Sequence, residues 1–169
     1  MSNQTVTIFV PWFSLRGVEN KSIRKTAKYR SDKGPSQVPI PREELETLSA
    51  QFNIKFLLAI MNSEFALRYL SHIRKGDTDI LPDEWKQLPI VVIPLSAQQP
   101  FIDLVDRILS EFQTYGYPLP DEPAVRVAVW EHQINEKVYE IYGITPNDIE
   151  TLAAAAPTDL GETDDDEEA

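Results

Sequence analysis

The pattern of hydrophobic and polar positions predicts a chain built largely of helices, with the strongest helical signal near its centre. Over residues 54–74, apolar side chains recur at intervals of three and four, which places them on one face of a helix. The members of this stripe are Ile54, Leu57, Leu58, Met61, Phe65 and Tyr69. We expect one continuous helix with the stripe in the core, stopped by Gly76.

Two more long helices are expected later in the chain. One begins at a Ser96 N-cap and continues to Phe112, and the other follows a proline-rich break at 118–123 and closes at Gly143. The residues expected to face inward are Phe101, Val105, Ile108, Leu109 and Phe112 in the first, and Val127, Trp130, Ile134, Val138 and Ile141 in the second. The second stripe either packs within this chain or docks on a partner.

Short helices are expected at three other places. REELETLSAQ, residues 42–51, has the composition of a surface helix, and Pro82 opens a short turn, PDEWKQL, with acids at its positive end. Thr145, Pro146 and Asp148 predict the N-cap, the first-turn proline and the dipole-facing acid of a last helix.

Two apolar runs predict strands. In TVTIFVPWF, residues 5–13, apolar and polar positions alternate, which predicts a strand that passes into a loop at Pro11. PIVVIP, residues 89–94, is a short apolar run with a proline at each end, which predicts a buried or edge strand. Together with the helices they predict the α+β class, with a few-stranded small sheet and several packed helices. We expect one domain over residues 1–156, with a basic arm at 16–42, followed by a disordered acidic tail over residues 157–169.

Charge is distributed unevenly along the chain. The 169 residues carry a formal net charge of -11, and seven of the acids lie in residues 158–169. Residues 16–33 instead hold seven lysines and arginines against two acids. Such segregation is typical of an interaction protein, while a solvated loop and a solubilising tail are the simpler interpretations of the two segments.

Composition excludes several kinds of chemistry. Without cysteine there is no disulfide framework or thiolate metal site, and two histidines sixty residues apart, His72 and His132, argue against zinc. The sequence has neither a glycine-rich phosphate loop nor a serine nucleophile elbow. The apolar runs are too short to span a bilayer and the N-terminus is too polar for a signal peptide, so we expect a cytoplasmic protein.

One acidic stretch has part of the pattern of a nuclease. DTDILPDEWK, residues 77–86, places acids before Glu84 and Lys86, as in restriction-type nucleases that bind Mg²⁺. That chemistry needs the glutamate and the lysine on a strand, where side chains two residues apart share a face. Because Pro82 predicts a helical turn, we interpret the acids as helix-capping residues.

Five stretches, taken in order, resemble one protein family. They are FVPWFSLRGVENKSIRKTAKY at 9–29, QFNIKFLLAIMNSEFALRYL at 51–70, DEWKQLPIVVIP at 83–94, QQPFIDLVDRIL at 98–109 and INEKVYEIYGIT at 134–145. Their order, over roughly Ile8 to Leu152, resembles the TaqI-like C-terminal specificity domain of type IIG restriction–modification enzymes, which is fused to N6-adenine methyltransferases. The resemblance implies a target-recognition module that binds double-stranded DNA.

The catalytic motifs of those enzymes do not occur in this sequence. It has no glycine-containing loop for S-adenosylmethionine and no Asn-Pro-Pro-aromatic loop to grip a flipped adenine, and TPND at 145–148 has the wrong order. The resemblance therefore implies no cofactor in this chain. S-adenosylmethionine and Mg²⁺ would belong to a partner methyltransferase or endonuclease chain, or to a missing domain.

The basic segment suits DNA recognition because neutralising phosphates dominates affinity for DNA. The residues expected to contact DNA are Arg16, Lys21, Ser22, Arg24, Lys25, Thr26, Lys28, Tyr29, Arg30 and Lys33. Gln37 and Arg42, with Arg24, are candidates for reading base edges. Trp12 and Trp85 either stack on bases or pack internally. The acidic tail favours an alternative function, a protein–protein interaction or anti-restriction module that mimics DNA, which the basic segment opposes.

Overall fold

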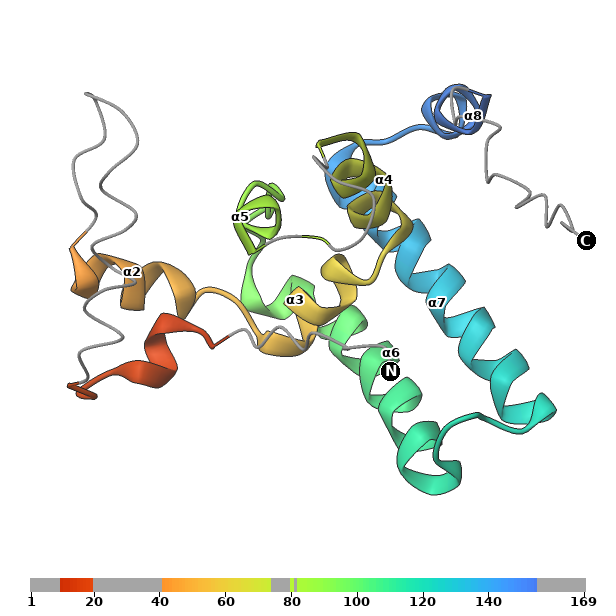
Figure 1. Cartoon of the computed structure of the whole chain (residues 1–169), viewed down its shortest axis with the longest axis horizontal. Helices are drawn as coiled ribbons and strands as arrows, with labels where there is room; N and C mark the ends of the chain where they lie inside the picture. The colour runs from red at the N-terminus through yellow and green to blue at the C-terminus, as the bar shows by residue number, and fades with distance from the viewer. Residues whose placement is uncertain (1–9, 20–40, 74–79, 81, 155–169) are drawn as a thin grey trace, which may run out of the picture.

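The described part of the chain is built from helices. The computed structural model describes residues 10–19, 41–73, 80 and 82–154 (Figure 1). Its elements are the 3-10 helix η1 (Trp12–Leu15) and the α-helices α2 (Arg42–Ser49), α3 (Ile54–Met61), α4 (Glu64–Ile73), α5 (Pro82–Trp85), α6 (Leu95–Tyr115), α7 (Asp121–Tyr142) and α8 (Pro146–Ala154). These residues contain no strand, so the prediction of an α+β fold is wrong and the described part is all-α.

Neither predicted strand forms within the described residues. Residues 12–15 make η1 rather than the end of a strand, whereas residues 5–9 lie outside the described part. Residues 89–94 lack regular structure, and side chains satisfy part of their backbone. The Tyr142 hydroxyl donates to the carbonyl oxygen of Pro89 at 2.5 Å, and Gln98 Nε2 donates to that of Ile93 at 3.1 Å. Because prolines at both ends lack an N–H, the segment is poorly equipped for sheet pairing.

The predicted continuous helix over 54–74 is divided into α3 and α4. The break falls at Asn62 and Ser63, where the Ser63 hydroxyl donates to the Ile60 carbonyl oxygen at 2.6 Å. The Ser63 hydroxyl oxygen also accepts a hydrogen bond from the Ala66 N–H at 3.3 Å, as an N-cap side chain does. Ser63 therefore ends one helix and begins the next. The expected stop at Gly76 lies outside the described residues.

The predicted apolar stripe of α3 is out of phase with the buried face. Phe56 and Ile60 are fully buried, whereas Ile54 is 46% exposed and Leu58 is 40% exposed. The sequence of this helix, IKFLLAIM, is apolar on almost every side, so its periodicity cannot select one face. The prediction that Ile54 and Leu58 lie in the core is wrong.

The core lies where α3, α4, α6 and α7 meet. α6 and α7 form an antiparallel pair, and α3 packs across α6. The Phe56 ring meets the Phe101 ring edge-on, with centroids 5.2 Å apart. The buried apolar residues of this core are Phe56, Ala59, Ile60, Ala66, Leu88, Phe101, Leu104, Val105, Ile134 and Val138. The second predicted stripe therefore packs largely within the chain.

The end signals of the later helices are mostly confirmed. Gly143 closes α7 in the left-handed conformation, with φ of 66°. Thr145 and Asp148 cap α8 reciprocally, since the Thr145 N–H donates to Asp148 Oδ2 at 2.8 Å and the Asp148 N–H to Thr145 Oγ1 at 3.3 Å. The Ser96 N-cap is wrong, because α6 begins at Leu95 after Pro94 and has no side-chain cap.

η1 and α2 form a small unit that lies apart from the other helices. They pack on each other, and Figure 1 shows them at one end of the molecule, joined to α3 through residues 50–53. We call η1 and α2 the arm unit, and α3, α4, α6 and α7 the helical body. The short helices predicted at 42–51 and after Pro82 are confirmed as α2 and α5.

Candidate nucleic-acid interface

The predicted DNA-binding residues lie almost entirely outside the described part of the chain. Arg16 is the member that the structure describes, in the turn after η1. Those outside are Lys21, Ser22, Arg24, Lys25, Thr26, Lys28, Tyr29, Arg30 and Lys33, together with Gln37. The structure does describe the two elements that residues 20–40 connect, η1 and α2.

Three contacts hold η1 against α2. The Arg42 guanidinium donates to the backbone carbonyl oxygen of Leu15, and the Phe13 N–H donates to Ser49 Oγ at 2.8 Å. Arg16 Nε and Glu46 Oε2 lie 3.3 Å apart. Because residues 20–40 connect η1 to α2, these contacts keep the two ends of that connection together. We call the contacts the arm clamp.

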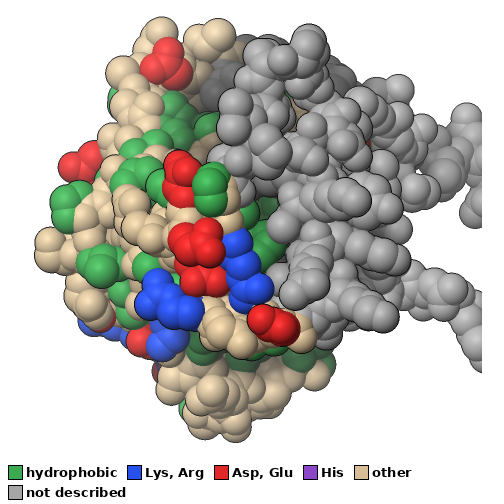
Figure 2. Space-filling model, turned by 90° about the vertical axis from the view of Figure 1, so that its left-hand side faces the viewer, with side chains coloured by type: hydrophobic (Ala, Val, Ile, Leu, Met, Phe, Trp, Pro, Cys, Tyr) green, Lys and Arg blue, Asp and Glu red, His purple; other side chains and the backbone are tan. Residues whose placement is uncertain are grey.

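Glu46 is the centre of the arm clamp because its carboxylate meets two guanidinium groups. Arg42 Nε lies 2.8 Å from Glu46 Oε1, while Arg16 reaches the other carboxylate oxygen. The Glu46 side chain is only 11% exposed, whereas that of Arg16 is 68% exposed. Two cations around one carboxylate leave the cluster with a net positive charge. Figure 2 shows basic and acidic side chains side by side on this end of the molecule.

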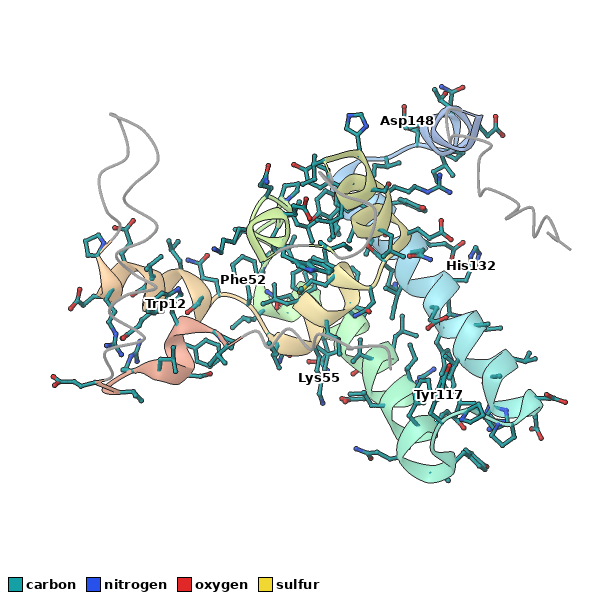
Figure 3. The ribbon with its side chains drawn as sticks, viewed as in Figure 1. Trp12, Phe52, Lys55, Tyr117, His132 and Asp148 are labelled. Atoms are coloured by element: carbon teal, nitrogen blue, oxygen red, sulfur yellow. The ribbon has the colours of Figure 1, made fainter. Side chains whose placement is uncertain are left out.

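The structure assigns different surroundings to the other recognition candidates. Two of the five N–H donors of the Arg42 guanidinium are engaged within the arm clamp, which fixes this side chain against η1 and α2. Trp85 packs against the core, in keeping with its structural interpretation. Trp12 is half-buried on η1, within the arm unit (Figure 3).

The described part of the chain is acidic as a whole. It contains seventeen aspartates and glutamates and eight lysines and arginines. Several of these cations are paired within the body: Lys55 with Asp106, Arg68 with Glu64 at 3.9 Å, and Arg126 with Glu111 at 3.0 Å. An acidic surface repels a polyanion, so the helical body is a poor surface for DNA.

The titratable groups of α6 and α7 with shifted pKa values belong to contacts within the helical body. The Arg126 guanidinium lowers the pKa of the Glu111 carboxyl, to which it donates two hydrogen bonds at 3.0 Å. Burial, aided by the hydrogen bond to Glu64, raises the pKa of Tyr139 to about 12. Burial also raises the pKa of Tyr142. These shifts follow from packing and pairing, and they mark structural contacts rather than a reactive group.

The residues considered for metal or nuclease chemistry do not converge in the described part of the chain. No group of three potential ligands occurs there. His132 is exposed on the outward side of α7, 3.7 Å from Glu136 (Figure 3), and His72 is exposed on α4. Glu84 is buried in α5, on a helical turn as expected, while residues 77 and 79 lie outside the described part.

Within the described residues, no helix combines the length and the apolar character needed to cross a membrane. Comparison with known proteins gives no match to any protein-family model, curated protein or solved structure. The likeness to type IIG specificity domains therefore stays a prediction from the sequence.

The sequence analysis missed Glu46 and Ser49, which hold the arm clamp together. A signal for Glu46 was present, because Arg42 and Glu46 are four residues apart on a predicted helix and such a pair meets on one face. No comparable spacing links Ser49 to Phe13, since the two are 36 residues apart.

Proposed function

We propose that the chain is a DNA-recognition module that presents the basic segment, residues 16–33, to double-stranded DNA from one end of an acidic helical body. The observation that supports this most strongly is the segregation of charge. Residues 20–40 hold six lysines and arginines against one acid, whereas the described residues hold about twice as many acids as bases. The arm clamp keeps both ends of the connection together at the end of the molecule.

This separation orients the protein on DNA. Attraction between the basic segment and phosphates acts over roughly the Debye length, about 8–10 Å at physiological salt. The acidic body is repelled over the same range, so the end of the molecule that carries the basic segment approaches the duplex first. Neutralised phosphates release counterions, which makes affinity strongly dependent on salt.

The class of system follows from the sequence resemblance, which the proposal retains. We infer a specificity module of a type IIG restriction–modification system, working in the cytoplasm with a methyltransferase or endonuclease partner. This chain contributes binding, and the partner contributes S-adenosylmethionine, Mg²⁺ and chemistry.

Fluorescence anisotropy with a labelled duplex tests the proposal. We expect salt-dependent binding that is lost when Lys21, Arg24, Lys25, Lys28, Arg30 and Lys33 are changed together to alanine. A circular-dichroism melt of the same variant should match that of the wild type, because exposed cations contribute little to folding. Equal binding by the two proteins would contradict the proposed interface.

The acidic body supports a second candidate, a module that binds basic surfaces of DNA-processing proteins by resembling DNA. The observation that favours this candidate is the excess of acids in the described helices. The two candidates differ in a simple assay. A DNA mimic inhibits a restriction endonuclease without itself binding the duplex, whereas a recognition module binds the duplex and leaves an unrelated endonuclease active.

A further inference from the structure

Gln98, on α6, is a fully buried polar side chain that reaches two separate segments of backbone. Its Oε1 accepts a hydrogen bond from the Asn53 N–H at 2.8 Å. Its Nε2 donates to the Gln51 carbonyl oxygen at 2.7 Å and to the Ile93 carbonyl oxygen at 3.1 Å. Both amide hydrogens and one oxygen lone pair are thus used on backbone groups.

Two of those backbone groups belong to the connection between the arm unit and the helical body. Residues 50–53 link α2 to α3, and Gln98 bonds both Gln51 and Asn53 within them. Asn53 in turn caps α3, because its Oδ1 accepts from the Lys55 N–H at 2.9 Å. One side chain of the body therefore fixes the point at which the connection becomes helix.

Backbone hydrogen bonds to α2 also hold this connection, from the Gln51 N–H to the Leu48 carbonyl oxygen and from the Phe52 N–H to that of Ser49, and an aromatic contact joins it to the body. Phe52 stacks on Phe56, with ring centroids 6.5 Å apart and planes within 1° of parallel. Figure 3 shows Phe52 where the arm unit joins the body. A stacked ring resists removal of the segment but allows sliding, whereas directed hydrogen bonds fix orientation.

We propose that Gln98 is a positioning residue, whose buried amide fixes the direction in which the arm unit leaves the helical body. In the setting of the proposed function, on which this purpose rests, the amide determines where the body holds the basic segment relative to DNA. Within the described residues the arm unit packs mainly on itself, and residues 50–53 join it to the body, so this connection carries its orientation.

Spin-label distances test the clamp without DNA. The chain has no cysteine, so Glu43→Cys on α2 and Gln113→Cys on α6, both at exposed positions, provide one label on each part. We expect a single narrow distance distribution in this parent and a broadened or shifted one after Gln98→Met. Gln99→Met is the matched control, because Gln99 is exposed and its amide donates to Asp103 on the same helix.

Amide hydrogen exchange supplies a second readout at a defined atom. In Gln98→Met the Asn53 N–H loses its acceptor, and we expect its exchange to accelerate about tenfold, the equivalent of about 1.4 kcal/mol. Exchange at Val138, in the core of α7, should change less. A merely structural role predicts equal acceleration at both sites.

Each result decides the matter. An unchanged distribution in Gln98→Met, or a broad one in the parent, would overturn the proposal. If Gln98→Met does not unfold cooperatively, Gln98→Ala, which also removes both the acceptor and the donors of the amide, takes its place. Failure of both to fold beside a folded Gln99→Met would show that the amide supports the whole body, which also overturns it. Because no DNA is present, loss of the proposed function leaves these outcomes unaffected.

Discussion

The guanidinium of Arg42 donates a hydrogen bond to the backbone carbonyl oxygen of Leu15, across a sequence separation of 27 residues. The two residues stand on either side of the connection that carries most of the basic segment. From the sequence alone, Arg42 is a candidate for reading bases. In the structure, its side chain holds η1 on α2. This bond gives Arg42 a structural role within the arm clamp.

Arg42→Ala should loosen η1 without unfolding the helical body. η1 has no buried residue of its own, so little apolar burial is at stake. We expect faster hydrogen exchange at the Phe13 N–H, which bonds Ser49 on α2, and a thermal midpoint close to that of the wild type. Arg68→Ala, which removes another arginine paired four residues along its helix, is the control and should leave Phe13 unaffected.

Phe56→Ala should be among the most destabilising single changes in the body. The ring is fully buried and packs edge-on against Phe101, so its loss leaves a cavity that costs about 3–5 kcal/mol in the free energy of unfolding. Leu58→Ala on the same helix removes a side chain that is 40% exposed and should cost clearly less. Urea titrations compare the two. A larger loss of stability for Leu58→Ala than for Phe56→Ala would contradict the assignment of the buried face of α3 to Phe56.

Tyr139→Phe should reduce the amount of unfolding free energy that the protein loses as the pH becomes alkaline. Burial and Glu64 raise the pKa of the folded phenol to about 12, above the unfolded value of ~10. Its contribution to stability is therefore complete below about pH 10 and is lost as pH rises toward the folded value. Urea unfolding from about pH 9 to about pH 11 measures this. The wild type should lose more stability over that window than the variant, and equal losses would contradict the assignment.

Sequence patterns predicted the later helices well because their ends carry strong local signals. Gly143 provides the left-handed residue that closes α7, and Thr145 and Asp148 form a reciprocal cap that depends on neighbours alone. Such signals involve residues within four positions of one another. Tertiary context changes them little.

The failures have a common origin in contacts that are distant in sequence. The run at 89–94 has the apolar character of a strand, but Tyr142 and Gln98 meet its carbonyl groups instead of a neighbouring strand. In α3, apolar residues occur on nearly every side, and only packing against α6 selects Phe56 over Leu58. Pairing between η1 and α2 depends likewise on partners about thirty residues away, as the 30-residue separation of Arg16 and Glu46 shows.

The dependence of DNA affinity on salt tests the central claim most directly. Two triple-alanine variants are compared with the wild type. The first removes three charges from the basic segment, at Arg24, Lys25 and Lys28, and the second removes three from the helical body, at Lys55, Arg107 and Lys137. Each lost phosphate contact lowers the slope of log affinity against log salt by about 0.9, so the first variant should be shallower by up to about 2.7. The second variant should keep the wild-type slope. Equal slopes in wild type and the first variant, or a fall confined to the second, would contradict the assignment of DNA contact to the basic segment.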